Sequence, residues 1–380
     1  MHRYDNCVKA QGCLIRTQPF SCDFDRDSVL AALGATELND YVCTLEDEDS
    51  GGPYIRIWLD AQHVAQWMPG FNTLELTRTL ALDTALHEAH LVREIVVTLL
   101  ASPAVLEFPS LDELLSAVRI RVNTVNAARK TMLAFGTSEA ERPEDYWVYD
   151  EDRGFTTLPG VSLIDALRKA TQPDVSGALY AFSCYRASEY VILLAIAQEL
   201  ALSNPELFAQ LEDLWTHRPV KSGEFHDVFL REQGSMEVPM PPCYFVPGDR
   251  TWFRNPDEAS ADASGFEGSW VMYLGGGLFT NFWKRDQPYT LADKCLEIYH
   301  WRDGLFTDPA GDARIDEDKV AVFVKATLEN PAELERVMSV MVRYREPRGV
   351  YTVAGGCMDT TREFARWVRP GTADLVIPAA

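Results

Sequence analysis

The stretch YAFSCYRASEYVILLAIAQEL, residues 180–200, decides how this chain is interpreted, because it places one cysteine at the start of a strongly apolar helix. Ser183 is a residue type that caps helix N-termini, and the apolar run 191–196 follows two turns later. The helix is therefore expected in a core. Cys184 is either an inert packed thiol or a nucleophile presented by the helix end.

A thiol in the first turn of a helix has a physical route to activation. Unpaired backbone N–H groups there carry partial positive charge, which stabilises the thiolate and lowers the pKa of the cysteine. Arg186 lies within one turn and adds positive charge. The competing interpretation is the commonest fate of a free cysteine, which is to be buried and unreactive.

Composition indicates a folded, acidic protein. The chain has 380 residues, of which 47% are hydrophobic and 24% charged, as in globular proteins. This length predicts two domains or one elaborated domain. The formal net charge of −22 repels phosphate backbones and anionic lipid headgroups. We therefore expect neither a nucleic-acid partner nor a membrane partner.

Targeting signals are not recognisable in the sequence. Residues 1–27 contain no apolar run after a basic start, and no later segment reaches the roughly 18 apolar residues that a membrane span needs. This pattern predicts a cytoplasmic protein. A bacterial effector exported without a cleaved signal would have the same pattern.

The cysteines are widely spread, which predicts reduced thiols rather than a disulfide framework. Half of them crowd the N-terminal region without a CxxC pair, and a structural zinc site usually contains such a pair. The eight are Cys7, Cys13, Cys22, Cys43, Cys184, Cys243, Cys295 and Cys357.

Residues 1–144 predict a mixed, mostly helical domain of unknown role. YVCTL (41–45) and YIRIWL (54–59) have the composition of short strands around an acidic Gly-Gly-Pro turn. Helical spacing follows over residues 74–100, and a second helix begins after Ser110, a suitable N-cap. The polar segment 136–154 is the best linker candidate, so we place the domain boundary at 144/145.

Residues 145–380 predict an α+β domain in which the cysteine helix accompanies an antiparallel sheet. A short helix is expected in SLIDALRKA (162–170). CYFVPGDRTWFRNPD (243–257) predicts two strands around a Pro-Gly-Asp turn, and SWVMYLGGGLFTNFW (269–283) predicts a hairpin with a glycine turn. Three later segments complete the prediction: KCLEIYHW (294–301) as a strand beside that hairpin, GVYTVAGGC (349–357) as a late strand, and 319–328 with 332–345 as helical or mixed.

Three segments together resemble a known family. CYRASEYVILLAIAQEL (184–200), PGDRTWFRNPD (247–257) and FEGSWVMYLGGGLF (266–279) are similar to the cysteine helix, Pro-Gly-Asp strand and YLG-x-G hairpin of bacterial spore-coat-type protein-glutamine gamma-glutamyltransferases. More distantly they resemble the papain-like superfamily that includes the NlpC/P60 enzymes. The resemblance covers residues 146–300 and implies a papain-like transglutaminase domain.

This resemblance implies cysteine-dependent acyl transfer on protein glutamine side chains, with Cys184 as the nucleophile. The thiolate attacks the carboxamide carbon, ammonia leaves, and an amine or water resolves the thioester. The product is a cross-link or a deamidated side chain. The implied partners are protein glutamine substrates and lysine or other amine substrates.

The residues expected to assist Cys184 depart from the family pattern. Ser269 stands where the family has an acidic residue, and residues 280–282 stand where it has a histidine. Glu267 is our first substitute, because it would share a face with Ser269 if the strand began early. His300 is the second substitute, on the strand expected at 294–301. Each also has an ordinary structural interpretation.

Two other functions stay open at this stage. A transglutaminase-like fold that has lost its bases would only bind a partner. LHEAHLVRE (86–94) places His87, His90 and Glu94 near one helical face, as in a metal-dependent hydrolase, but the spacing is not HExxH. A polar helix face is the simpler interpretation, so we expect no metal and no cofactor. His217 and His226 are expected in a surface loop.

Overall fold

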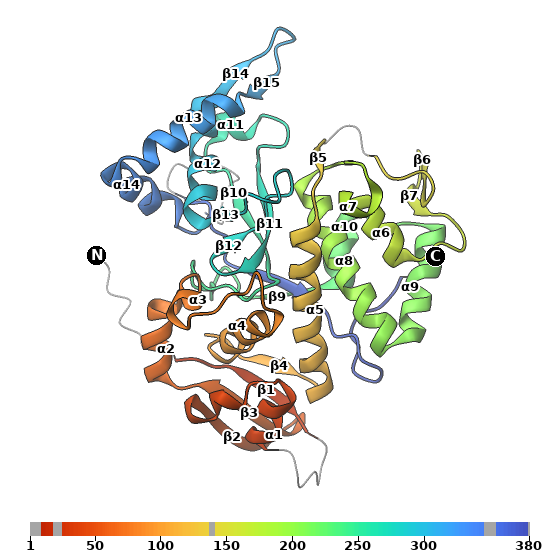
Figure 1. Cartoon of the computed structure of the whole chain (residues 1–380), viewed down its shortest axis with the longest axis vertical. Helices are drawn as coiled ribbons and strands as arrows, with labels where there is room; N and C mark the ends of the chain where they lie inside the picture. The colour runs from red at the N-terminus through yellow and green to blue at the C-terminus, as the bar shows by residue number, and fades with distance from the viewer. Residues whose placement is uncertain (1–8, 18–24, 137–140, 346–354, 379–380) are drawn as a thin grey trace.

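The computed structural model describes residues 9–17, 25–136, 141–345 and 355–378. Figure 1 shows a small sheet at one end of the molecule, two long helices through its middle and a second sheet beside them. The two helices are α5 (Leu111–Lys130) and α8 (Cys184–Ser203). The protein is therefore an α+β fold, as the sequence predicts.

The N-terminal sheet contains the expected hairpin. β2 and β3 pair antiparallel along their full length, and β1 lies between β3 and β4. Alternate residues of β3 are buried (Ile55, Ile57 and Leu59), because strand side chains point to opposite faces in turn. The strands are β1 (Cys13–Arg16), β2 (Val42–Asp49), β3 (Gly52–Leu59) and β4 (Leu106–Phe108).

Helices connect this sheet to the centre of the molecule. The expected helical region 74–100 contains two helices, α3 and α4, which are separated by a turn that includes Ala81 at a positive φ of 52°. The elements are α1 (Arg26–Ala32), η1 (Thr36–Tyr41), α2 (Ala61–Trp67), η2 (Pro69–Phe71), α3 (Leu76–Thr79) and α4 (Glu88–Leu100).

The central helices carry the caps that the sequence predicts. The Ser110 side chain accepts a hydrogen bond from the Glu113 N–H at the start of α5. Helix α8 is buried continuously over residues 187–197 and packs against α5, α6 and α9. Around it lie α6 (Leu163–Thr171), α7 (Pro173–Ser176), α9 (Pro205–His217), α10 (Ser222–Phe229) and two short ribbons, β5 (Ala134–Phe135) with β8 (Ala181–Phe182) and β6 (Trp147–Asp150) with β7 (Gly154–Thr157).

The second sheet has the order β13-β12-β11-β10-β16-β9, and its strand pairs are antiparallel. Its centre is the pair β10 and β11, both of which lie in segments predicted as strands, and the predicted glycine-turn hairpin joins β11 to β12. The strands are β9 (Leu230–Gln233), β10 (Arg250–Arg254), β11 (Gly268–Gly275), β12 (Leu278–Phe279), β13 (Tyr289–Thr290) and β16 (Arg362–Ala365).

This sheet separates two hydrophobic cores. Met272 and Leu274 belong to the core that contains α8, whereas Val271 and Tyr273 belong to the core that contains α12. Alternate residues of β11 therefore point to opposite sides. The second core is covered by α12 (Leu291–Gly304), α13 (Glu317–Leu328) and α14 (Pro331–Met341), with α11 (Glu258–Ala261) and the ribbon β14 (Leu305–Thr307) and β15 (Ala313–Ile315) nearby.

Two strand predictions are wrong. Residues 243–246 lie in turns before β10, where the Val246 N–H donates to the Asp249 carboxylate. Residues 294–301 belong to helix α12, which begins with a capping box between Thr290 and Asp293. Of the late strand expected at 349–357, residues 349–354 lie outside the described residues, and 355–357 are not in a strand.

The predicted boundary at 144/145 stays a prediction. One core cluster contains side chains from both parts, including Val125 of α5 and Ile192 of α8. The N-terminal helices therefore share buried surface with the cysteine helix.

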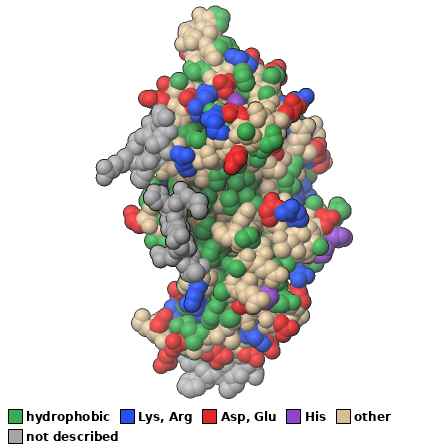
Figure 2. Space-filling model, turned by 90° about the vertical axis from the view of Figure 1, so that its left-hand side faces the viewer, with side chains coloured by type: hydrophobic (Ala, Val, Ile, Leu, Met, Phe, Trp, Pro, Cys, Tyr) green, Lys and Arg blue, Asp and Glu red, His purple; other side chains and the backbone are tan. Residues whose placement is uncertain are grey.

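The surface mixes both signs of charge. Figure 2 shows acidic and basic side chains interspersed on one face, with hydrophobic side chains gathered in a hollow at mid-height. No helix in the described ranges is long and apolar enough to cross a membrane.

Candidate active site

Cys184 occupies the first residue of α8, where the sequence places it. Ser183 is the N-cap, and its side chain accepts a hydrogen bond from the Arg186 N–H at 3.2 Å. Behind the cysteine the helix is anchored in the core, while the Cys184 residue itself is only partly buried. The rigid helix therefore holds Cys184 at the rim of the core.

Polar groups surround the Cys184 sulfur. Burial is the largest influence and raises the pKa of the thiol. Hydrogen bonds from the backbone N–H groups of Trp270 and Tyr185 and the positive charges of Lys294 and Arg250 act against it and lower the pKa. The net shift of the Cys184 pKa is upward, so the resting group is the neutral thiol. Four neighbours stabilise its ionised form.

The sheet explains why the Trp270 N–H is available. β11 pairs with β10 along residues 268–272, but β12 pairs only with its second half, at Tyr273 and Gly275. Among the described strands, the first half of β11 therefore has no partner on that edge. The cysteine at the end of α8 approaches this edge, and its sulfur accepts from a backbone donor that a neighbouring strand would otherwise use.

Arg250 joins the cysteine helix to the sheet. Its guanidinium lies 3.9 Å from the ring centroid of Trp270 and 4.6 Å from that of Tyr185. Nε donates to Ser188 Oγ in α8 at 2.9 Å, and Nη1 donates to the Glu363 carboxylate in β16 at 2.8 Å. The side chain is 1% exposed, and Nη2 has no hydrogen-bond partner among the described residues. No sequence pattern had indicated that Arg250 lies near the cysteine.

Lys294 approaches from the other side of the sheet. It is buried in α12, where its Nζ donates to Glu297 at 2.6 Å and lies 4.3 Å from the Tyr289 ring centroid. Because residues 294–301 were expected as a strand, no sequence pattern placed this ammonium near the thiol. The helix explains its position.

Glu267 hydrogen-bonds within its own loop, and no hydrogen bond joins its carboxylate to Cys184 among the described residues. Glu267 directly precedes β11, which begins at Gly268, and its side chain is exposed. Its carboxylate accepts from the Gly265 N–H at 3.3 Å. The strand does not begin early enough to include it, which was the condition for facing Ser269. A catalytic role for Glu267 stays a prediction.

His300 lies in α12 and links two helices. Its Nδ1 is 2.7 Å from Oδ2 of Asp303, and its Nε2 is 2.8 Å from Oγ1 of Thr327 in α13. The ring is 5% exposed and stacks on Phe323. Both ring nitrogens therefore have structural partners, and a role as base stays a prediction.

Side chains at the positions where the family has a histidine, residues 280–282, also make structural contacts. Thr280 Oγ1 accepts from the Met272 N–H, and the Asn281 amide bridges the Gln287 carbonyl and the Lys284 N–H. Within the part of the chain that the structure describes, no histidine or carboxylate hydrogen-bonds to the Cys184 sulfur.

The His87, His90 and Glu94 set does not form one site. His90 Nδ1 accepts from the Asp83 N–H. Glu94 points to the β11–β12 hairpin instead, where it accepts from the Tyr273 hydroxyl and the Gly276 N–H. Burial raises the pKa of Glu94 to about 7. The glycine run is thus a hairpin turn seated on a buried carboxyl group.

A different cluster is arranged as potential metal ligands. His226, Glu232 and Glu363 place ligand atoms within 4.8 Å of one another, and the described residues contain no other such group. His226 lies in α10 rather than in the expected loop. Glu232 and Glu363 had given no signal in sequence, because pairing of β9 with β16 brings them together across 131 positions.

Two of three comparisons with known proteins found a match. The family description "Protein-glutamine gamma-glutamyltransferase" matches residues 73–376. No curated protein sequence matches the chain significantly. Among solved structures, the chain is similar to the transglutaminase from Geobacillus stearothermophilus (without C-terminal extension), with 21% identity over 57% of this chain and 98% of that chain and a TM-score of 0.39.

Proposed function

Because the chain belongs to the protein-glutamine gamma-glutamyltransferase family, we propose that Cys184 is the nucleophile of its acyl transfer on protein glutamine side chains. The family supports the reaction class, glutamine acyl transfer. The identity of the nucleophile and the fate of the acyl group belong to the proposal.

The proposed reaction has two balanced steps. The Cys184 sulfur bonds to the γ-carboxamide carbon, the C–N bond breaks, and the thiol proton leaves with the nitrogen as ammonia. A lysine amine or another primary amine then attacks the thioester, and one amine proton returns to the sulfur as the C–S bond breaks. Water in place of the amine gives deamidation.

One observation carries this proposal: backbone donors and buried cations converge on a thiol at a helix N-terminus. The N–H groups of Trp270 and Tyr185 and the charges of Lys294 and Arg250 all favour negative charge at the sulfur. Donors fixed by the fold stabilise developing charge without having to reorganise. An inert core cysteine has no need of such neighbours.

A specific observation also supports the second candidate, a binding protein without activity. The net pKa shift of Cys184 is upward, and no described histidine or carboxylate hydrogen-bonds to it. A thiol in this state is a weak nucleophile at neutral pH. The two candidates differ in one measurable property, which is turnover.

Monodansylcadaverine incorporation into casein, with parallel measurement of ammonia release, tests the proposal. The wild-type protein is expected to show both activities, with rates that still rise at about pH 9, because ionisation of the thiol requires alkaline conditions. The Cys184→Ser variant should lose at least about 100-fold of both activities, whereas Cys243→Ser, a matched change at another partly buried thiol, should keep its activity.

Ammonia release without amine incorporation would indicate deamidation. Activity retained in Cys184→Ser would identify a different nucleophile, and no activity in wild type would favour the binding protein.

A further inference from the structure

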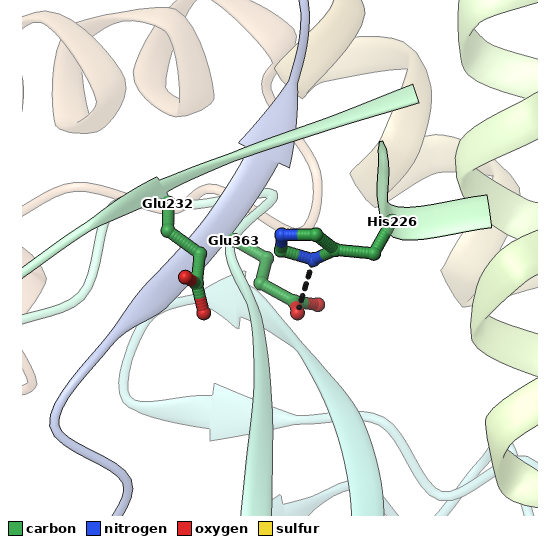
Figure 3. Close-up of side chains that lie close together, drawn as sticks. All are labelled: His226, Glu232 and Glu363. Carbon is green, nitrogen blue, oxygen red and sulfur yellow. Dashed lines mark hydrogen bonds and ion pairs between the residues drawn. The ribbon is translucent and has the colours of Figure 1, made fainter. Parts of the chain in front are cut away.

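Three side chains from separate elements converge near β9 and β16, at the edge of the sheet opposite β13. His226 comes from α10, Glu232 from β9 and Glu363 from β16 (Figure 3). We propose that these three residues bind a first-row divalent cation, with Zn²⁺ as the best fit. The proposal does not depend on the acyl-transfer reaction.

Strand register provides the first argument. In the antiparallel pair of β16 and β9, Glu363 lies directly opposite Glu232. Like charges directly opposite each other on one face of a sheet repel and destabilise the pairing. A divalent cation between the two carboxylates would convert this repulsion into attraction. Among the described residues, Glu363 pairs with Arg250 and with His226 itself, whereas Glu232 has one side-chain donor, the uncharged Thr361.

The hydrogen bonds from Arg250 and Thr361 occupy one oxygen of each carboxylate and leave the other oxygen for a metal. Oε2 of Glu363 accepts from Arg250, and Oε1 of Glu232 accepts from the Thr361 hydroxyl at 3.1 Å. The remaining oxygens are Oε1 of Glu363, which has only His226 Nδ1 at 3.0 Å, and Oε2 of Glu232, which has no donor among the described residues. Outer hydrogen bonds of this kind orient the carboxylates that hold a metal.

The donor set favours a particular class of ion. An imidazole with two carboxylates matches zinc and its neighbours better than calcium or magnesium, which prefer more numerous oxygen ligands. Three protein ligands leave room for water on the ion. Glu232 is exposed and His226 partly exposed, so the ion can enter from solvent.

Local charge also favours a cation. Glu363, Glu232 and Asp227 place negative charge around the His226 imidazole. Arg250 opposes a cation, but it is bound to the opposite oxygen of Glu363.

Equilibrium dialysis against ZnCl₂ tests the site. Tag-free protein is first treated with iodoacetamide, so that accessible thiols do not bind the ion, and the bound zinc is then quantified at pH 7.5. The wild-type protein is expected to bind one Zn²⁺ per chain. Glu232→Gln, which changes an exposed side chain and should fold, is expected to weaken binding at least about tenfold. His226→Gln should do the same.

His217→Gln is the matched control, because His217 is an exposed histidine near a carboxylate of its own helix. This variant should bind zinc as the wild type does, and far-UV circular dichroism verifies the fold of all three. Binding below one ion per chain at about 100 μM free zinc would overturn the proposal. Equal binding by wild type and the two ligand variants would also overturn it, because the ion would then lie elsewhere.

Discussion

At the residue scale, the Cys184 thiol is governed by two opposing influences. Burial favours the neutral thiol, and the four donors and cations around the sulfur favour the thiolate. Burial is the larger influence, so the helix N-terminus alone does not produce an ionised cysteine. Cys184 lies at the start of α8, as the sequence predicts, but the effect of burial on its pKa was not part of that prediction.

Alkylation across pH measures that balance. Because the net shift of the Cys184 pKa is upward, the rate constant for iodoacetamide should keep rising beyond pH 9, the ordinary thiol value, rather than level off near neutrality. Peptide mass spectrometry assigns the modified residue. Arg250→Met should raise the midpoint further by removing a cation, whereas Arg78→Met, an exposed arginine in α3, should not change it. A plateau below pH 8 would contradict the prediction.

The two substitute bases show the limit of prediction from single residues. Glu267 and His300 were chosen because the segments around them could be strands, and the helical state of residues 294–301 removed the reason for choosing His300. Arg250 and Lys294 were missed because their position depends on sheet pairing and on α12. The position of Cys184 at the start of α8 was predicted correctly because its signal is local: a cap, a thiol and an apolar helix.

At the scale of elements, prediction succeeded where the signal was local and strong. The caps at Ser110 and Ser183 and the glycine-turn hairpin are all present. Helix α12 was missed because it is buried on several sides, including Leu296, Ile298 and Trp301. Such a segment has no amphipathic period, and short apolar runs do not distinguish strand from helix.

The contact between α4 and the β11–β12 hairpin leads to a pH-dependent prediction. The Glu94 carboxyl group has a pKa of about 7 in the folded protein and 4.5 when exposed. Between those values the folded state keeps a proton that the unfolded state loses, so stability falls as pH rises. Gly275 permits this contact, because a Cβ there would lie 2.5 Å from Glu94 Oε2.

Glu94→Gln removes the titration. Relative to wild type, the variant's free energy of unfolding should increase by up to about 3 kcal/mol between pH 4.5 and pH 7 and then stay constant. Urea denaturation at several pH values measures the difference. Glu88→Gln, at an exposed position of the same helix, should give no trend. A difference that is independent of pH would show that Glu94 is ionised throughout this range.

At the scale of the whole molecule, α5 connects distant parts of the chain. The Glu113 carboxylate at its start accepts from the N–H groups of Val368 and Arg369 near the C-terminus. Arg119 pairs with the buried Glu199 of α8. These partners lie 80 to 256 positions away in sequence, and no local pattern predicts them. Figure 1 shows the helix running through the centre of the molecule.

We expect residues 1–144 and 145–380 to unfold together. Arg121 of α5 and Asp249, before β10, form an ion pair at 2.7 Å with side chains only 6% and 2% exposed. Removing one partner leaves a buried charge, so Arg121→Met should cost about 3 to 5 kcal/mol. Because the core is shared, tryptophan fluorescence and far-UV circular dichroism should give one coincident urea transition, and Arg121→Met should shift that transition as a whole.

The control variant Arg78→Met, which removes an exposed pair with Glu75, should cost less than about 1 kcal/mol. Two separate transitions, with only one displaced by Arg121→Met, would instead support independent domains on either side of the 144/145 boundary.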